Sequence, residues 1–401
     1  MKARLAVATG TRAEYGIFRP LLRAFERRGW PFRLYVTGSH LSPLHGLTVH
    51  EIEDDGFTID ARIDLQMDSD AATAVCRSMG LAAAGFGEVL ERDRPDLLFL
   101  LGDRYEALAI AAAAELTRVP VAHVHGGERS EGAVDEAFRH AITKMSSVHF
   151  VATEAYRRRV LQLGEDPSAV HNVGALGLDN LASTDWIDRD VLQKELGFRF
   201  RGTNLVVTQH PLTTDPERSH ADAVALLEAL ECFPDVGLVF SAPNADVGRG
   251  TLAELIAAFV GRHADRATVA SSLGTRRYFS LLRVVDAVVG NSSSGLIEAP
   301  SFGIPTIDVG DRQKGRIAGP SVVHSAGEPT AIAHAIECAL SRTFREAARN
   351  NSNPYGSGNT AGAICAILEG LDFPLPKQKA FHDLAAGVFG EPTVAAPGAL
   401  L

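Results

Sequence analysis

Short apolar runs alternate with segments of helical periodicity along almost the whole chain, and no other feature constrains the fold as strongly. The apolar runs predict strands at Leu5–Ala8, Arg33–Val36, Leu97–Leu101, Val119–Val124, Val148–Ala152, Leu205–Thr208, Val236–Ser241, Thr268–Ala270, Ala287–Val289 and Thr306–Val309. The segments between them predict helices at Phe18–Arg28, Ala71–Arg92, Glu106–Thr117, Ala221–Cys232, Thr251–Arg262 and Thr275–Val284. This order predicts an α/β fold with parallel sheets covered by helices on both faces.

The length of 401 residues exceeds one ordinary domain and favours two. A polar stretch at Ala182–Asp185 indicates a linker, so we expect Rossmann-like, doubly wound domains at residues 1–180 and 181–375. The last predicted helix, near Asn359–Leu371, fits either domain. Residues 376–401 are rich in Pro, Gly and Ala, and we expect a partly mobile tail. Two such domains in tandem bring the carboxyl ends of both sheets to a central cleft, where ligands bind in this fold class.

Composition and charge narrow the class of partner. The net charge of −10 opposes broad binding to nucleic acid or to acidic membranes, and no apolar run reaches the length of a membrane span. The four cysteines, Cys76, Cys232, Cys338 and Cys365, lie far apart, so we expect small core residues rather than disulfides or a zinc site. We therefore expect a cytoplasmic protein that takes a small ligand.

A serine-rich segment, Gly290-Asn-Ser-Ser-Ser-Gly-Leu-Ile-Glu298, follows a predicted buried strand in the second half. We expect a helix from Gly295 through Ser301, whose first amides and dipole would favour a phosphate beside Ser292 and Ser293. Glu298 would lie one turn into that helix, where a carboxylate can accept hydrogen bonds from a sugar diol. Taken alone, the segment fits a serine N-cap with a solvated glutamate about equally well.

Other polar residues of the second half also follow predicted strands. Arg312, after the strand at Thr306–Val309, is a fixed charge placed to close over a diphosphate. His210 is placed to contact phosphate, and Asn244 to contact a sugar or a base. Together with the serine-rich segment, ligand contacts are therefore expected at four strand ends of the second domain.

In the first half, Arg12 follows the first strand, and Asp103 and Arg104 follow the very apolar run at Leu97–Leu101. The loop with Arg12 has no Gly-x-Gly-x-x-Gly fingerprint, and a capping turn with a solvated arginine explains it slightly better than a diphosphate contact. An Asp–Arg pair at the end of a buried strand more often marks a functional pocket, although Asp103 would also serve as a helix N-cap.

A cluster of proton-carrying residues follows the next strand. His123 and His125 are expected on one face of the strand, a spacing that also suits a metal, but no third ligand has convincing spacing. General acid–base chemistry is the better interpretation, with Glu128 close by and Asp135 and Glu136 in the first turn of a predicted helix. Ordinary pairing on a helix surface is the alternative for these last two carboxylates.

Several of these segments together resemble the hydrolysing UDP-N-acetylglucosamine 2-epimerases of bacterial sialic acid biosynthesis. The resemblance runs from Thr9 to about Gly358. It rests on Gly-Thr-Arg-Ala-Glu-Tyr-Gly, Gly-Asp-Arg-Tyr-Glu, His-Val-His-Gly-Gly-Glu, Arg-His-Ala-Ile-Thr-Lys-Met, Arg-Arg-Val-Leu-Gln-Leu-Gly-Glu, Gly-Asn-Ser-Ser-Ser-Gly-Leu-Ile-Glu, Gly-Asp-Arg-Gln-Lys-Gly-Arg and Asn-Ser-Asn-Pro-Tyr. Several long matches in one order are far more specific than any single motif.

The resemblance implies the GT-B fold, with UDP held mainly by the second domain, and a homo-oligomer, either a dimer or a tetramer. It places Asp103, His125 and Asp135 at positions implicated in proton transfer. The positions that match nucleotide or substrate contacts are Arg12, Arg104, His210, Asn244, Ser292, Ser293, Glu298 and Arg312. Some relatives have Glu where this chain has His125, so Glu128 and Glu136 remain alternative proton carriers.

The implied reaction converts UDP-GlcNAc and water to ManNAc and UDP, by loss of the C2 proton with UDP and rehydration of the glycal. Neither a metal nor another cofactor is required. The same reaction on UDP-2,4-diacetamido-2,4,6-trideoxyglucose, for legionaminic acid, is the alternative that these motifs leave open. A GT-B glycosyltransferase and a non-enzymatic UDP-sugar sensor are more distant alternatives, because neither needs so many ionisable groups at the strand ends.

Overall fold

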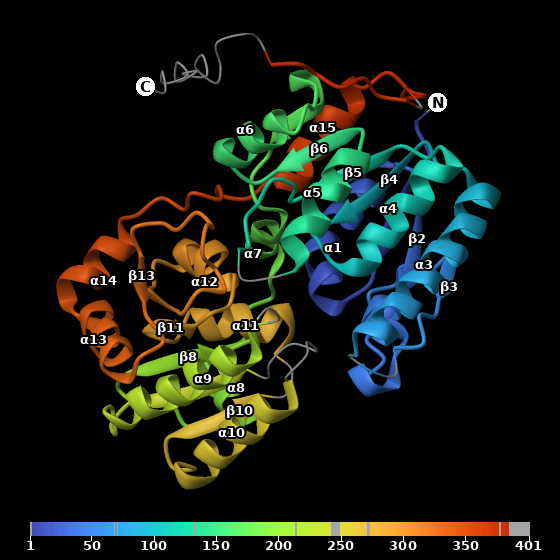
Figure 1. Ribbon diagram of the computed structural model, residues 1–401. Coiled ribbons are helices and arrows are strands. Elements are labelled where there is room, and N and C mark those ends of the chain that lie inside the picture. Colours follow the sequence, from blue (N-terminus) through green and yellow to red (C-terminus); the bar gives the residue numbers. More distant parts are fainter. Residues whose placement is uncertain are drawn as a thin grey trace, which may run out of the picture.

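The computed structural model describes residues 2–384, apart from 68, 70, 132–133, 213–214, 242–248, 271–272 and 377. These residues form two parallel sheets, in separate lobes joined near the middle of the molecule (Figure 1). The first sheet has the order β3-β2-β1-β4-β5-β6-β7, and the second has the order β10-β9-β8-β11-β12-β13. The prediction of two doubly wound parallel sheets is confirmed.

The strands and helices alternate as the sequence predicts. The strands are β1 (Leu5–Thr9), β2 (Phe32–Thr37), β3 (Ala61–Ile63), β4 (Leu97–Leu101), β5 (Val121–Val124), β6 (Val148–Val151), β7 (Val170–Asn172), β8 (Asn204–Thr208), β9 (Gly237–Ser241), β10 (Ala267–Ala270), β11 (Ala287–Gly290), β12 (Thr306–Val309) and β13 (Val322–Ser325). The α-helices are α1 (Arg12–Arg28), α2 (Val49–Asp54), α3 (Ala72–Asp93), α4 (Tyr105–Thr117), α5 (Asp135–Met145), α6 (Glu154–Gln162), α7 (Asn180–Ser183), α8 (Arg189–Leu196), α9 (Pro216–Glu231), α10 (Arg249–Arg262), α11 (Gly274–Leu282), α12 (Ser294–Ile297), α13 (Pro329–Leu340), α14 (Arg342–Arg349) and α15 (Thr360–Gly370).

In each sheet the strand order reverses next to the first strand of the lobe. β1 lies between β2 and β4, and β8 lies between β9 and β11. The chain therefore leaves these neighbouring strands toward opposite faces, which opens a crevice at their carboxyl ends. All five residues of β4 are buried, as expected for an apolar strand covered on both faces.

Three short edge strands were not predicted from the sequence, nor were the helices α2, α6, α8, α13 and α14, and one predicted helix is shorter than expected. β3, β7 and β13 have only three or four residues each, and all three contain exposed or half-buried positions, so their apolar signal is weak. The helix expected from Gly295 through Ser301 is the single turn α12, followed by a 3₁₀ turn at Ala299–Phe302. Pro300 explains the break, because it has no amide hydrogen and its ring clashes with the preceding turn of an α-helix.

The cysteines also differ from the expected core positions. Cys365 is buried, whereas Cys76, Cys232 and Cys338 are exposed, and all four are free thiols. Within the described part of the chain, no helix combines the length and the hydropathy that crossing a membrane requires.

The last helix, α15, packs with the first lobe. Its residues Ile364 and Leu368 lie in one core cluster with Phe18 of α1. At the start of α15 the carboxylate of Asp179 accepts hydrogen bonds from the amides of Thr360 (2.8 Å) and Ala361 (2.7 Å). The predicted range 181–375 placed this helix with the second sheet. Its packing is instead with the first, because the chain crosses back between the lobes before α15 begins (Figure 1).

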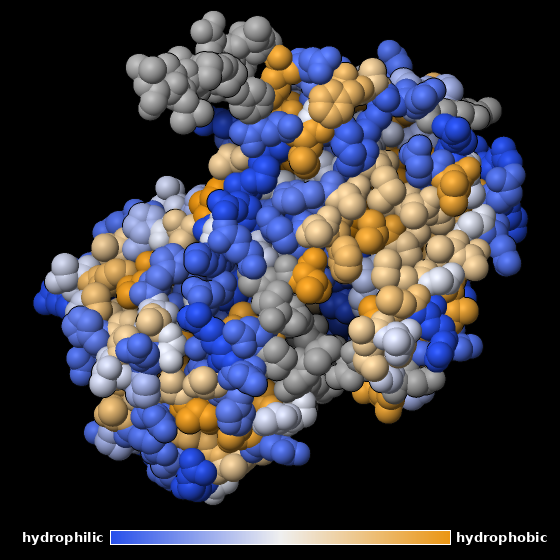
Figure 2. Space-filling model, viewed as in Figure 1, coloured by the Kyte–Doolittle hydropathy of each residue, from blue (hydrophilic) through white to orange (hydrophobic). Residues whose placement is uncertain are grey.

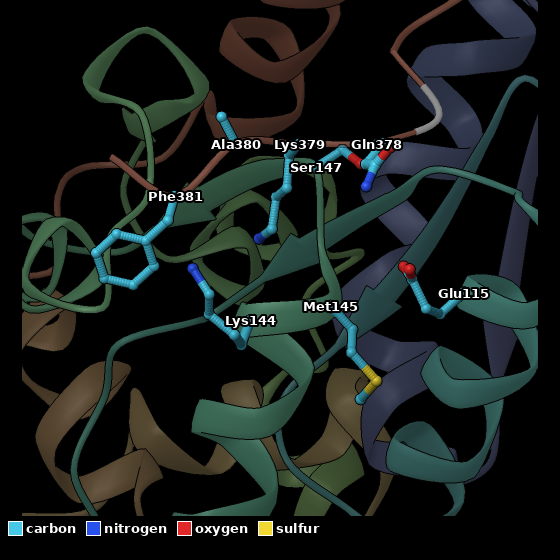
Figure 3. Close-up of a pocket in the computed structure, with 8 residues that line it drawn as sticks. All are labelled: Glu115, Lys144, Met145, Ser147, Gln378, Lys379, Ala380 and Phe381. Atoms are coloured by element: carbon cyan, nitrogen blue, oxygen red, sulfur yellow. The ribbon is translucent and has the colours of Figure 1, made fainter. Parts of the chain in front are cut away.

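The described part of the tail, residues 378–384, lies on the first lobe beside a cavity of about 390 Å³. Figure 3 shows Lys144 and Lys379 extending into one space, with Phe381 beside Lys144. Both amino groups contact the buried carboxylate of Glu165, and His149 Nε2 lies 3.0 Å from the same carboxylate. Burial alone would raise the pKa of Glu165, but these three partners lower it to about 2. Residues 385–401 of the predicted tail lie outside the described residues.

We expect Lys379→Met to lower the free energy of unfolding by about 1–2 kcal/mol at pH 7, because the buried Glu165 carboxylate loses one of its partners. A carboxyl group whose pKa falls on folding stabilises the folded state above its unfolded pKa. That contribution disappears as the pH falls toward about 2. The difference from wild type should therefore shrink below about pH 4 in urea unfolding followed by circular dichroism. Lys194→Met, on the exposed face of α8, is the control, and equal losses in both variants would contradict the prediction.

Candidate active site

The first lobe brings three loops together at the carboxyl ends of β4 and β5. These strands pair directly, so the loop with Asp103 after β4 lies next to the loop with His125 and Glu128 after β5. The first turn of α5 supplies Asp135 and Glu136. The fold therefore places all five proposed proton-carrying residues in neighbouring loops.

A buried arginine, Arg139 of α5, connects these loops. Its guanidinium donates to the carbonyl of Glu128 (3.0 Å), to Glu136 Oε2 (3.1 Å) and to Ser130 Oγ (2.8 Å), and it forms an ion pair with Asp103. Burial, and to a lesser degree the charge of Arg316, lower the pKa of Arg139 to about 9, so the guanidinium stays charged at neutral pH. Arg139 is not among the site residues predicted from the sequence, because most of its partners come from other loops.

His125 and Glu128 form a close pair. His125 Nδ1 lies 2.6 Å from Glu128 Oε1, and His125 adopts the left-handed backbone conformation with φ +65°. Burial alone would raise the pKa of Glu128, but the charges of Arg316 and His125 lower it. Glu128 is therefore an ionised carboxylate that accepts a hydrogen bond from Nδ1 of His125. A neutral His125 therefore carries its proton on Nδ1 and has an unprotonated Nε2, which accepts a long hydrogen bond (3.4 Å) from the Leu176 amide.

The ring of His123 has hydrogen-bond partners different from those of His125. Its Nε2 donates to the carbonyl of Gly102 (2.7 Å), and its Nδ1 lies 3.0 Å from Thr143 Oγ1. Burial lowers the pKa of His123 to about 3, so the ring is neutral and supports the loop that carries Asp103. In the ranges that the structure describes, no three His, Cys, Asp or Glu side chains are grouped to hold a metal. The expectation that no metal is needed stays a prediction.

The two arginines proposed as ligand contacts in the first lobe are both paired with carboxylates. Arg12 lies at the start of α1, where Thr11 and Glu14 form a capping box, and its Nε is 2.7 Å from Glu51. Its guanidinium also faces α11 of the second lobe, because a Cβ at Gly274 would lie 2.6 Å from Arg12 Nη2. Arg104 Nε donates to Glu106 Oε1 (2.7 Å). The paired carboxylates therefore orient both guanidinium groups at the carboxyl end of the first sheet.

In the second lobe, the side chain and carbonyl of Asn291 tie together the loops after β8, β11 and β12. Its Oδ1 accepts from the His210 amide (2.7 Å), and its Nδ2 donates to the His210 carbonyl (2.8 Å). The Asn291 carbonyl accepts from Arg312 (3.2 Å) and Gln313 (2.8 Å). Asn291 is not among the predicted site residues, although its position between a buried strand and three serines is a signal in the sequence.

The remaining proposed residues of the second lobe lie around Asn291. Burial places the pKa of His210 well below its ordinary value, so this imidazole is neutral at physiological pH. Ser292 Oγ accepts from the Ser294 amide (3.3 Å), and Ser293 comes just before the single turn α12. Burial raises the pKa of Glu298, whose carboxylate faces Gly177 at the junction of the lobes. Asn244 lies outside the described residues.

One loop of the second lobe reaches the proposed acid–base residues of the first. Arg316, between β12 and β13, has its Nη2 3.3 Å from Glu128 Oε2, and its Nε donates to the carbonyl of Arg129 (3.3 Å). The next residue, Ile317, donates its amide to Tyr156 Oη (3.1 Å). The sites of the two lobes are therefore in direct contact.

Comparison with known proteins agrees with this architecture. The family model described as UDP-N-acetylglucosamine 2-epimerase matches residues 23–369. The chain belongs to this family. It is 34% identical over 346 residues to the GDP/UDP-N,N'-diacetylbacillosamine 2-epimerase (hydrolyzing) of Campylobacter jejuni, covering 86% of this chain and 89% of that protein. It is 35% identical over 382 residues to the polysialic acid biosynthesis protein P7 of Escherichia coli, covering 95% and 96%.

Solved structures of the UDP-N-acetylglucosamine 2-epimerase family share the fold. The Neisseria meningitidis enzyme, solved with UDP-GlcNAc bound, superposes with a TM-score of 0.79 at 18% identity, covering 92% of this chain and all of that one. The Listeria monocytogenes protein gives a TM-score of 0.77 at 20% identity, covering 92% and 96%. The GT-B fold, two Rossmann-like domains that face each other, is confirmed.

We expect Arg139→Met to abolish detectable turnover and to lower the free energy of unfolding by about 2–4 kcal/mol, because Asp103 and Glu136 lose their shared cation. The value lies somewhat below that of a fully buried pair because both carboxylates are partly exposed. Urea unfolding measures the change. Arg158→Met on α6, where the arginine side chain is 76% exposed, is the control and should be within about 0.5 kcal/mol of wild type. A stable, active Arg139→Met would contradict the central place given to this arginine.

Proposed function

We propose that this protein is a hydrolysing 2-epimerase of a UDP-linked N-acetylated amino sugar. A base removes the C2 proton, the C1–O bond breaks with its electron pair leaving on UDP, and a C1–C2 double bond forms. Water then adds its hydroxyl to C1 while a proton returns to C2 on the opposite face. The observation that carries the proposal is the 3.3 Å contact between Glu128 and Arg316, because it joins the acid–base cluster to the loop that bears Arg312.

The surroundings of the carboxylates favour some proton carriers over others. Glu128 is held between Arg316 and His125, and Glu136 accepts from Arg139 and from the Ser130 amide (2.6 Å). The charges of Arg316 and His125 lower the pKa of Glu128 and make it a weak base. We assign proton transfer to Asp103, His125 and Asp135, the positions that the family resemblance implicates, and Arg139 orients Asp103 through their ion pair.

Binding of UDP is assigned to the second domain. Arg312, Ser292 and Ser293 would surround the diphosphate, with Arg12 reaching it from the first domain. His210 would contact phosphate as a neutral donor, in keeping with its burial. Glu298 would bind the sugar diol, with Asn244 and Arg104 as further substrate contacts. The positive charge at the diphosphate would stabilise UDP as the leaving group.

UDP-GlcNAc is the first candidate substrate, with ManNAc and UDP as products that supply sialic acid biosynthesis. UDP-2,4-diacetamido-2,4,6-trideoxyglucose is the second candidate. The names of two relatives favour it, the Campylobacter jejuni enzyme and the UDP-N,N'-diacetylbacillosamine 2-epimerase (hydrolyzing) of Legionella pneumophila, which is 34% identical over 379 residues. The protein would act in the cytoplasm without a cofactor.

We also propose that the chain forms a homo-oligomer. Figure 2 shows apolar side chains gathered over the face of the first lobe where α3 and α4 pack together. Leu116, at the end of α4, is 84% exposed. An exposed apolar face of this kind supports association through the first domain.

The decisive test is the reaction of each candidate UDP-sugar in D2O, followed by NMR. We expect free sugar with deuterium at C2 and inverted configuration, because the abstracted proton is replaced from solvent. The substrate with the higher kcat/KM identifies the preferred sugar. Free sugar without deuterium and with the original configuration would mean simple hydrolysis and would contradict the proposal.

Two substitutions should separate chemistry from binding. Asp103→Asn should lower kcat about a hundredfold or more and leave UDP affinity nearly unchanged, because it removes only the carboxylate charge. Arg312→Ala should weaken UDP binding by about 1.5–3 kcal/mol in calorimetry, the scale of a charge-assisted contact.

Each substitution has a matched control. Asp185→Asn changes an exposed aspartate that pairs with Arg276, and Arg218→Ala removes an arginine that pairs with Asp311 beside the Arg312 loop. Both controls should stay within about twofold of wild type, the range of ordinary surface substitutions. Unchanged UDP affinity in Arg312→Ala would show that this arginine does not hold the diphosphate.

A further inference from the structure

The carboxylate of Glu128 in the first domain is paired with a cation from the second domain. The side chains of Glu128 and Arg316 are 4% and 13% exposed, and Glu128 Oε2 lies 3.3 Å from Arg316 Nη2. Arg139, the other buried arginine nearby, binds the carbonyl of Glu128 rather than its carboxylate. Arg316 therefore places a positive charge on the Glu128 carboxylate, which also contacts His125.

The loop that carries Arg316 is seated firmly on the first domain. Gly315 has φ +85°, a left-handed conformation that favours glycine, and a Cβ there would lie 3.0 Å from the side-chain Oε1 of Glu131 and 3.1 Å from Nε of Arg129, so the loop lies close to the first domain. The Glu131 amide donates to the carbonyl of Lys314 at 3.4 Å. On the other side of Arg316, Tyr355 Oη donates to the Ile317 carbonyl (2.9 Å). Backbone contacts on both sides thus fix where the guanidinium points.

The charge of Arg316 decides where the proton between Glu128 and His125 resides. Burial alone would raise the pKa of Glu128, and Arg316 is the largest influence that lowers it. With Arg316 present, Glu128 is ionised and accepts from Nδ1 of His125, which leaves Nε2 as a base. Without that charge, the buried pair would take up one further proton from solvent, and a protonated Glu128 would donate to Nδ1. The single ring proton of His125 would then lie on Nε2, which could not accept another.

We propose that Arg316 is a positioning residue for the reaction, which acts through Glu128 to hold His125 in the tautomer that can take a proton. The inference rests on the proposed function for its catalytic meaning. It adds a link between the domains, because Arg316 and Arg312 lie on the same loop. The residue assigned to the diphosphate and the residue that prepares the proton carrier therefore lie on one loop.

The first test needs no substrate. In full-length protein labelled with ¹⁵N-histidine, the ring nitrogens of His125 are assigned by their loss in His125→Gln. We expect wild type to show a protonated Nδ1 and an unprotonated Nε2 near pH 8, and Arg316→Met to show the opposite tautomer. Arg316→Lys, which keeps the charge, should resemble wild type. Arg129→Met is the control, because it removes an arginine from the same contact without touching the Glu128 carboxylate. An unchanged tautomer in Arg316→Met would overturn the proposal.

The second test is a double-mutant cycle in kcat. Arg316→Met should lower kcat about thirtyfold or more with KM within about threefold, whereas Arg316→Lys and Arg129→Met should stay within about fivefold of wild type. In a Glu128→Gln background, which has no charge to compensate, adding Arg316→Met should change kcat less than about threefold. An equal loss in both backgrounds would mean that Arg316 does not act through Glu128.

The double variant also covers the case in which Arg316→Met alone fails to fold, because the neutral amide introduced by Glu128→Gln leaves no buried charge unpaired. A double variant that folds and matches Glu128→Gln in kcat supports the inference, and one that is further impaired overturns it. If wild-type enzyme places no deuterium at C2, the proposed function fails. The tautomer measurement still decides the role of Arg316 separately.

Discussion

The site depends on the charge of Arg139, a guanidinium that is 1% exposed between the loops after β4 and β5. A buried cation of this kind is tolerated only where anions and carbonyls surround it. Asp103, Glu136, Ser130 and the carbonyl of Glu128 do so here, and they come from three different segments. The need to compensate one charge thus fixes the relative positions of the groups assigned to proton transfer.

In the second domain, a neutral side chain rather than a buried charge holds the strand-end loops together. Asn291 uses its side-chain amide and its carbonyl to hold the loops of His210 and Arg312. An amide can donate and accept at once, so it suits a position where backbone groups of two loops meet. Burial keeps His210 neutral, which leaves Arg312 as the charge assigned to the diphosphate. Each domain therefore has one residue that organises its strand-end loops, and Arg316 connects the two arrangements.

Interior strands were predictable because they are apolar on both faces, as in Leu97–Leu101 of β4. The edge strands β3, β7 and β13 could not be predicted, because half-buried positions give no continuous apolar run. The prediction of a helix from Gly295 through Ser301 is wrong because Pro300 prevents the α-helix from continuing beyond its first turn. Similarly, α15 could not be assigned from sequence, because its apolar face would fit either core and only the return of the chain to the first lobe decides.

The sequence by itself determined which residues lie at the carboxyl ends of the strands, because the alternation of apolar runs and helices fixes where each strand stops. It thereby identified Asp103, His125, Glu128 and Arg312 as site candidates. Only the tertiary structure decided which of them pair. Partners such as Arg139 with Asp103, or Arg316 with Glu128, are far apart along the chain, and periodicity carries no information about contacts between loops. The pairing follows from burial, since charges removed from water must be compensated by whatever loops the fold brings beside them.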